Sequence, residues 1–269
     1  MDGDIFLAQD VAGHVAERLG AINRHFTRGL DVHSRAPVFP TLQPFADSWV
    51  RTGFAWDRPS VIADEEILPF AEGSFDVVIS ILSLHAVNDL PGTLVQIRRV
   101  LKPDGVFIAG MFGGETLHEL KLAFAAAELE VSGGVSPHVS PFGDVRELGG
   151  LLQRAGFALP VADVERTIVR YRDIVRLFAD LRALGETNVL VGRRSGLLSR
   201  RMLNAVTAEY ASRFSDAEGR VTATFDIVFL TGWAPHESQQ KPLAPGSAKS
   251  RLADALGTEE QPTGEKPAP

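Results

Sequence analysis

The segment spanning residues 74–112 constrains the fold more than any other part of the sequence. It opens with SFDVVIS (74–80), a run rich in β-branched residues that is typical of a strand buried on both faces of a parallel sheet. Apolar residues then recur at helical spacing over 90–101, and the turn Lys-Pro-Asp-Gly leads directly into a second apolar run, VFIAGMF (106–112). Strand, helix, turn and strand at this spacing form a βαβ unit, whose ordinary form is a right-handed crossover in a doubly wound sheet.

Further elements flank this unit. Apolar spacing predicts a helix over 9–22 that leads into a short strand near 29–32. Later segments predict helices at 118–130, 145–155, 174–185 and 196–214, and strands at 162–173 and 221–234. The two helices between those last strands predict a cap over residues 173–215, laid over the edge of the sheet. The composition shifts to Pro, Gly, Ser, Lys and Glu from residue 240, which predicts a mostly disordered tail over 240–269 with a short helix at SRLADAL.

Composition narrows the classes of function. Lys and Arg number 27 against 34 Asp and Glu, for a net charge of −7, which disfavours nucleic acid as a partner. The absence of cysteine excludes disulfides, thiolate zinc sites, iron–sulfur clusters and cysteine nucleophiles. The start, MDGDIFLAQD, does not resemble a secretory signal, and the run FDIVFLTGWA is far shorter than the roughly 20 residues of a membrane helix. We expect a soluble, cytoplasmic protein with no transmembrane segment.

Four loops follow predicted strands and are the places to look for function. In an open parallel sheet the ligand lies outside the carboxyl ends of the strands. The loops are residues 33–37, 64–70, 82–89 and 112–116.

The motifs in and around these loops carry a family resemblance. They are ADEEILPF (63–70), the long stretch 75–120 with LSLHAVNDLP and MFGGETL, GGVSPHVSPF (133–142), LLQRAGF (151–157) and GWAPHESQQKP (232–242). Together they resemble the class I S-adenosylmethionine-dependent methyltransferase superfamily, and within it the branch of the mitochondrial complex I assembly factor that acts as an arginine hydroxylase. Malonyl carrier-protein methyltransferases are more distant relatives. The resemblance covers most of residues 10–255 and implies a seven-stranded, Rossmann-like methyltransferase domain over 1–239.

The resemblance also implies a cofactor, S-adenosyl-L-methionine, and residues that bind it. Asp31 matches the acid that closes the first strand, and Asp64, with Glu65 beside it, matches the carboxylate that receives the adenine amino group. Ser83, after the strand predicted at 74–80, belongs to the same predicted set. Asp57 is a weaker candidate for the acid that binds the ribose.

The loop after the first strand departs from the family. Where relatives read Gly-x-Gly-x-Gly, this chain has His33, Arg35 and Pro37. Side chains at 33 and 35 occupy space that the amino-acid part of the cofactor needs, and proline removes a backbone donor. Arg35 offers compensation by pairing with the methionine carboxylate. Loss of the cofactor and rescue by Arg35 therefore stand as alternatives, and in the second case His33 and Arg35 belong to the predicted cofactor-binding set.

Five further residues are candidates for catalysis or substrate binding. His85 is a possible general base beside Asn88 and Asp89, although a histidine after a buried strand equally suits a structural hydrogen bond. His138 and His236 are candidates for contacts with the substrate or the cap. The histidines show neither HxD nor HExxH spacing, so no metal site is predicted.

Two functions remain open. The first is a methyltransferase-like enzyme, with arginine hydroxylation as a variant, that acts on a protein or carrier-bound substrate, including a role in respiratory complex I assembly. The second is a non-catalytic assembly or binding protein that keeps the fold but has lost the glycine-rich loop. A nicotinamide oxidoreductase is disfavoured because no G-x-G-x-x-G follows the first strand.

Overall fold

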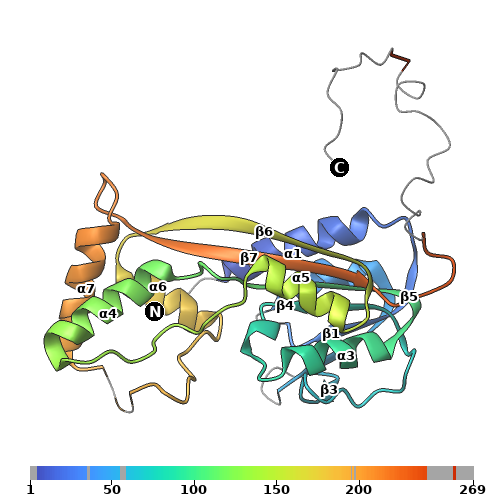
Figure 1. The fold of residues 1–269 in the computed structure, drawn as a ribbon, viewed down its shortest axis with the longest axis horizontal. Helices are drawn as coiled ribbons and strands as arrows, with labels where there is room; N and C mark the ends of the chain where they lie inside the picture. Colours follow the sequence, from blue (N-terminus) through green and yellow to red (C-terminus); the bar gives the residue numbers. More distant parts are fainter. Residues whose placement is uncertain are drawn as a thin grey trace, which may run out of the picture. The chain divides into compact units, whose positions relative to one another are not determined.

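A computed structural model describes residues 5–34, 37–54, 59–194, 196, 198–240 and 257–258. The chain divides into two units, Met1–His236 and Glu237–Pro269, and the elements below all belong to the first. Seven strands form one sheet in the order β3-β2-β1-β4-β5-β7-β6 (Figure 1). Their bounds are β1 Phe26–Val32, β2 Ala46–Gly53, β3 Val61–Ile62, β4 Phe75–Ile81, β5 Leu101–Phe112, β6 Ala158–Tyr171 and β7 Val221–Trp233.

The sheet is doubly wound and mostly parallel, as the sequence predicts. Strands β1 to β5 pair in parallel, whereas β7 runs antiparallel to both β5 and β6. Parallel strands place their carboxyl ends at one edge, so the loops after β1, β3, β4 and β5 meet there. The antiparallel β7 ends at the opposite edge, beside the start of β5.

Helices cover both faces of the sheet, which explains why β4 is buried along its whole length. Alternate residues of β5 belong to two separate apolar clusters: Val106 and Ile108 face one side, and Phe107 and Ala109 the other. The first cluster includes helix α1 (Phe6–Gly20), and the second includes α3 (Leu90–Val100) and α5 (Val145–Arg154). The period-two alternation of a strand therefore supplies two cores at once.

Two strands have no clear signal in the sequence. Strand β2 (ADSWVRTG) is only partly buried, and β3 has two residues, so neither forms an apolar run. Strand β2 forms because β1 offers a free edge, on which Phe26 to Val32 pair in register with Ala46 to Thr52, and β3 pairs in turn with β2. The predicted turn at 102–105 lies within β5 as a bulge, where the pairing jumps from Phe75–Leu101 to Val77–Val106.

The cap contains more than the two helices expected over 173–215. Helices α6 (Ile174–Ala183) and α7 (Arg200–Phe214) lie at one end of the sheet together with α4 (His118–Ser132) (Figure 1). The long β6–β7 pair extends toward this end. Helix α7 is fixed to β7 by the Tyr210 hydroxyl, which donates to the Thr222 carbonyl at 2.8 Å, and α4 by Glu119, which accepts from Thr224.

The C-terminal segment and the apolar character of the helices bear on two further predictions. Most of residues 240–269, including the predicted short helix at 250–256, lies outside the described residues. Within the ranges described above, no helix combines the length and the apolar character needed to cross a bilayer.

Candidate functional site

A polar cluster lies where β1, β3 and β4 end. The buried Ser83 hydroxyl donates to Glu65 Oε1 at 2.9 Å, and His33 Nδ1 lies 3.2 Å from the same oxygen. His33 Nε2 contacts the Ala63 carbonyl at 2.5 Å. All three side chains are buried, so the structure brings together His33, Glu65 and Ser83 of the predicted cofactor set.

His33 stands in a backbone conformation that favours glycine. Its φ is +51°, in the left-handed region, so the turn after β1 keeps the shape that a glycine would supply. The imidazole turns toward the β3 loop and packs edge-on against Phe54, with ring centroids 4.9 Å apart. The departure at position 33 therefore changes the side-chain space and leaves the turn in place.

Asp31 supports the turn after β1 through its side-chain contacts. Its carboxylate accepts from the Ser34 hydroxyl and pairs with Arg51 Nε at 3.2 Å. Ser34 in turn accepts from the Ile81 backbone N–H at 3.2 Å, which joins the β1 loop to the end of β4. Burial raises the pKa of Asp31, and the hydrogen bond from Ser34 and the charge of Arg51 only partly offset this effect.

Asp64 and Glu66 lie in the loop after β3 but outside the buried cluster. Asp64 is exposed, and its Oδ1 accepts from the Glu66 N–H at 2.9 Å, which closes a local turn. Glu66 Oε1 accepts from the backbone N–H groups of Asn88 and Asp89, at 2.6 and 3.2 Å. In this structure Glu65, not Asp64, points its carboxylate into the cluster, and the adenine role of Asp64 stays a prediction.

Asn88 and Asp89 serve the local structure of their loop. Asp89 is the N-cap of α3, where its Oδ1 accepts from the Gly92 N–H at 2.9 Å. Asn88 is exposed and contributes its backbone N–H to Glu66. Their predicted catalytic roles have no support in these contacts.

His85 is held by two aromatic neighbours and at one nitrogen. Its side chain is 3% exposed, and Nε2 lies 3.1 Å from Glu186 Oε1 in the segment after α6. The ring packs against Phe112 and Phe142, with centroids 4.7 and 5.7 Å away. Its Nδ1 is buried and has no hydrogen-bond partner within the described part of the chain. No local pattern links His85 to Glu186, which is 101 residues away, so sequence reasoning missed this partner.

His138 lies in the cap beside a buried carboxylate. Its Nε2 is 3.0 Å from Glu128 Oε1, and its ring stacks on Phe124 at 3.8 Å. Ser136 donates from both its N–H and its hydroxyl to Glu128. Burial raises the pKa of Glu128, but the hydrogen bonds from His138 and Ser136 outweigh this effect, so the pKa is lowered overall.

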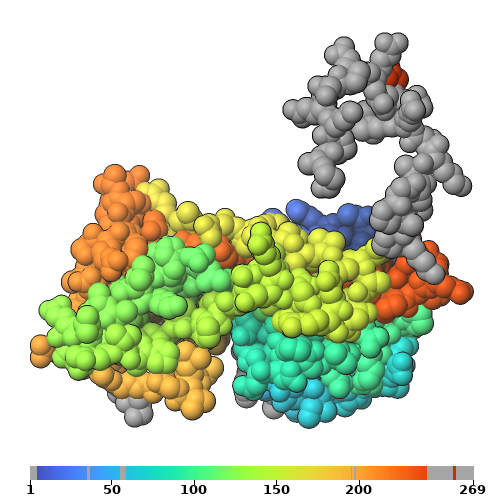
Figure 2. Space-filling model, in the orientation of Figure 1, coloured from blue at the N-terminus to red at the C-terminus, as the bar shows by residue number. Residues whose placement is uncertain are grey.

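A hollow of about 640 Å³ adjoins this pair, between α4, the segment 188–199 and the start of α7. Asn188, Arg193 and Arg194 line it beside His138. Figure 2 shows a cleft between the cap and the sheet end in the lower half of the view, while the two are continuous along the upper side.

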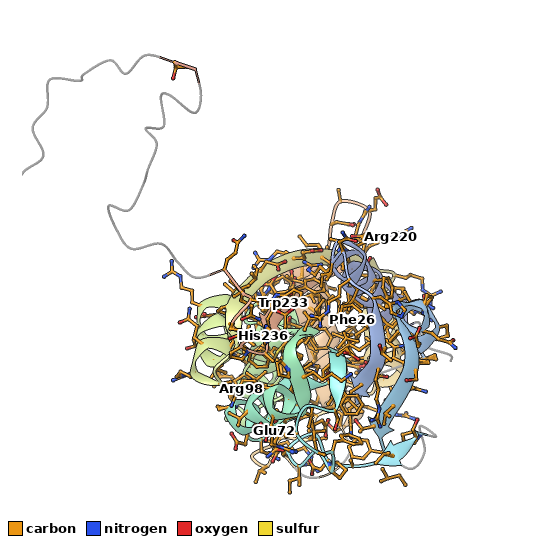
Figure 3. The ribbon with its side chains drawn as sticks, turned by 90° about the vertical axis from the view of Figure 1, so that its right-hand side faces the viewer. Phe26, Glu72, Arg98, Arg220, Trp233 and His236 are labelled. Carbon is orange, nitrogen blue, oxygen red and sulfur yellow. The ribbon has the colours of Figure 1, made fainter. Side chains whose placement is uncertain are left out.

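The structure places His236 away from the predicted site residues at the strand ends, and its predicted contact with the substrate or the cap stays a prediction. Antiparallel β7 carries the chain to the edge where the parallel strands begin, and Ala234 pairs there with the Gly105 backbone. Figure 3 looks onto this edge and shows His236 near Trp233 and Arg98. The residue therefore lies across the sheet from the ends of β1 and β4. The sequence could not reveal this, because it did not give the direction of the last strand.

Two predicted residues cannot be placed. Arg35 and Asp57 lie outside the described residues, so their predicted roles stay untested. Among the residues that are described, no group of three or more His, Asp or Glu side chains is arranged to hold a metal ion.

The residues at this edge fit an adenosine-type ligand in part. Glu65 offers carboxylate oxygens and Ser83 a hydroxyl, which are the groups that bind ribose hydroxyls and an exocyclic amine. The turn at His33 has the required backbone shape. Two side chains of this cluster already contact Glu65 Oε1, the Ser83 hydroxyl and the His33 imidazole.

Comparison with known proteins agrees with this reading of the fold. Residues 49–109 match a family described as "Methyltransferase domain". The chain is 42% identical over 262 residues to "Arginine-hydroxylase NDUFAF5, mitochondrial" of Danio rerio, covering 93% of this chain and 81% of that protein. It is 37% identical over 197 residues to "Malonyl-[acyl-carrier protein] O-methyltransferase" of Laribacter hongkongensis, covering 73% and 64%. The structure of the YcgJ protein of Bacillus subtilis shares the fold, with a TM-score of 0.55 at 15% identity over 84% of this chain and 99% of that one.

The strand order, together with the match to the methyltransferase domain family, defines a class I methyltransferase-type protein. A methyltransferase domain of this type supports S-adenosylmethionine as the cofactor, as the sequence predicts. More narrowly, the chain belongs to the family of arginine-hydroxylase NDUFAF5.

Proposed function

We propose that this chain binds S-adenosylmethionine over the carboxyl ends of β1, β3 and β4 and modifies a protein or carrier-bound substrate beside the cap. The observation that carries the proposal is the convergence of His33, Glu65 and Ser83 at these strand ends, in a chain of this family. The names of the relatives extend the proposal to an arginine or to a malonyl-[acyl-carrier protein] as the substrate. The family resemblance of the sequence adds a protein substrate and a role in the assembly of respiratory complex I.

Each residue has a distinct role in this proposal. Glu65 would accept hydrogen bonds from the adenosine part of the cofactor, and Ser83 would orient Glu65, as it already does. The bound cofactor supplies a methyl group on a sulfonium, which an acceptor attacks in line, so the protein contributes mainly positioning. His85, held at Nε2 by Glu186, would receive the acceptor's proton at Nδ1.

Arginine hydroxylation, which the relatives' name states, is a variant of this proposal. It would place the guanidinium of a protein substrate in the same cleft. Inserting an oxygen atom also needs an oxidant such as dioxygen and two electrons, which S-adenosylmethionine does not supply. The two chemistries differ in the mass added to the substrate, either a methylene unit or one oxygen atom, so mass spectrometry of a modified substrate separates them.

A second candidate, a non-catalytic assembly protein, is favoured by one specific observation. The His33 ring already satisfies Glu65 and the Ala63 carbonyl, so the polar groups of the cluster are paired without a ligand. A cofactor must displace the His33 ring or share Glu65 with it, and either option reduces the affinity of the protein for the cofactor.

Calorimetric titration with S-adenosylmethionine and with its demethylated product decides between the two. The proteins to compare are the natural chain, His33→Gly and the triple variant His33→Gly/Arg35→Gly/Pro37→Gly. His25→Gly is a matched control, because His25 is an exposed histidine just before β1.

Micromolar binding by the natural chain, about −8 kcal/mol, with unchanged binding by the control, supports the enzyme. Binding gained only in the glycine variants supports the assembly protein. No binding by any of them contradicts the cofactor proposal.

A further inference from the structure

His85 lines a second, smaller cavity that the proposed cofactor site does not use. The cavity has a volume of about 210 Å³ and lies between the loop after β4, the end of β5, the loop at 141–143 and helix α5. Its walls are mostly apolar, with Leu84, Met111, Phe142, Leu148 and Leu151 among them. His85 and Glu147 are its ionisable side chains. Glu147 is committed in part to the capping box of α5.

The unpartnered nitrogen of His85 gives this cavity a chemical preference. The Glu186 carboxylate accepts a hydrogen bond from His85 Nε2. In the neutral imidazole Nε2 therefore carries the proton, and Nδ1 presents a lone pair. A buried acceptor without a donor is unfavourable, and a ligand that supplies the donor removes this cost. An apolar ligand of the same shape supplies no donor and leaves this cost in place.

We propose that this cavity is the acceptor subsite and takes a small apolar group that bears an O–H or N–H donor, which hydrogen-bonds to His85 Nδ1. The size is suitable, since an apolar cavity of about 150 Å³ already binds benzene. Nδ1 is shielded from solvent, so a wall side chain has to turn aside, and Phe142 packs edge-on against the imidazole at 5.7 Å. The role as acceptor subsite rests on the proposed function, whereas the donor preference rests on His85 alone.

The test compares phenol with toluene, which have nearly the same shape but differ in the donor. Titrations followed by NMR on the full chain, without S-adenosylmethionine, give the affinity of each. We expect phenol to bind about five- to tenfold more tightly than toluene, which corresponds to one neutral hydrogen bond. His85→Phe should abolish the difference, and Leu151→Phe, which fills the cavity, should weaken both probes.

A measurement on the natural chain tests the proposal even if the variants fail to fold. The ¹⁵N resonance of His85 Nδ1 should shift as phenol is added, and the Nε2 resonance should shift much less. Equal affinity for the two probes, no binding of either, or a shift at Nε2 alone would overturn the proposal. Because no cofactor is present, these outcomes are independent of the cofactor titration, and a failure of one proposal is not mistaken for a failure of the other.

Discussion

At the scale of the residue, buried carboxylates at the strand ends set the chemistry of the site. Glu65 is paired with Ser83 and His33, and Asp31 with Ser34 and Arg51. The difference between the two acids is position: Glu65 lies in the loop, where a ligand could reach it, while Asp31 lies within the end of β1. Asp31 therefore supports the turn, and Glu65 is the better candidate to bind a ligand.

The raised pKa of Asp31 predicts a pH-dependent effect of Asp31→Asn. The folded protein holds the Asp31 proton more tightly than the unfolded chain, so the natural protein loses stability as pH rises through the folded pKa. Asparagine does not titrate, so the free energy of unfolding of Asp31→Asn should rise relative to the natural chain as the pH increases from the ordinary pKa of 3.8 through the raised pKa of the folded protein. Urea unfolding at a series of pH values measures this, with exposed Glu72→Gln as the control. A difference that falls with pH would contradict the raised pKa.

At the scale of the element, the cap is held by contacts between segments that are distant in sequence. Helix α4 is tied to the loop at 133–144 through Glu128 and to β7 through Glu119. Helix α7 is tied to β7 through Tyr210. The cap therefore depends on a few buried polar anchors as well as on apolar packing.

Glu128→Gln should destabilise the protein in a pH-dependent manner. The lowered pKa means that the ionised carboxylate contributes stability above its ordinary value of 4.5, and this contribution is lost as pH falls through the folded pKa. We expect a loss of about 2 kcal/mol at neutral pH and a much smaller loss in acid. Denaturant titration at both pH values checks this. Glu130→Gln, an exposed position on the same helix, should have little effect at either pH.

Tyr210→Phe should destabilise the cap at every pH at which the protein is folded. Burial raises the pKa of Tyr210 far above its usual value, so the phenol stays a neutral donor to Thr222. Losing this bond while the Thr222 carbonyl stays shielded should cost about 1 kcal/mol. Thermal unfolding, with Ser212→Ala on the exposed face of α7 as the control, measures the loss. An equal effect of the two substitutions would mean that Tyr210 is no anchor.

At the scale of the whole molecule, helix α1 packs on the sheet and contacts its edge strand β6. Its apolar face, including Val15 and Leu19, is buried in the core that also contains strands β4, β5 and β7. On its other side, Arg18 pairs with Asp163 at 2.6 Å and Glu165 at 3.0 Å and lies over the Phe229 ring. The helix thus links strand β6 to the core.

Leu19→Ala should therefore destabilise the whole folded unit. Leu19 is 1% exposed, and truncating such a side chain costs about 2–5 kcal/mol. If α1 belongs to one cooperative unit, the urea midpoint should fall while the dependence on urea stays the same, and fluorescence and circular dichroism should report one transition. Glu17→Ala on the exposed side is the control. Two separate transitions would show that α1 unfolds on its own.

Much of the fold could be predicted from the sequence, because helix and strand periodicities are local. The runs at 74–80 and 106–112 became β4 and β5, and the spacing over 90–101 became α3. Strand β2 escaped prediction because it is half exposed and forms by pairing with β1. The loops that line the site were also predictable, since parallel strands bring their carboxyl ends to one edge.

The sequence by itself determined the βαβ core, the edge at which the candidate site is predicted and the loss of glycine at position 33. Only the tertiary structure decided which side chains meet at that edge. It paired His33 with Glu65, paired His85 with Glu186 across 101 residues, and placed His236 at the opposite edge. The physical reason is that local spacing fixes the period of an element, whereas strand order and direction are set by packing and pairing of the whole chain.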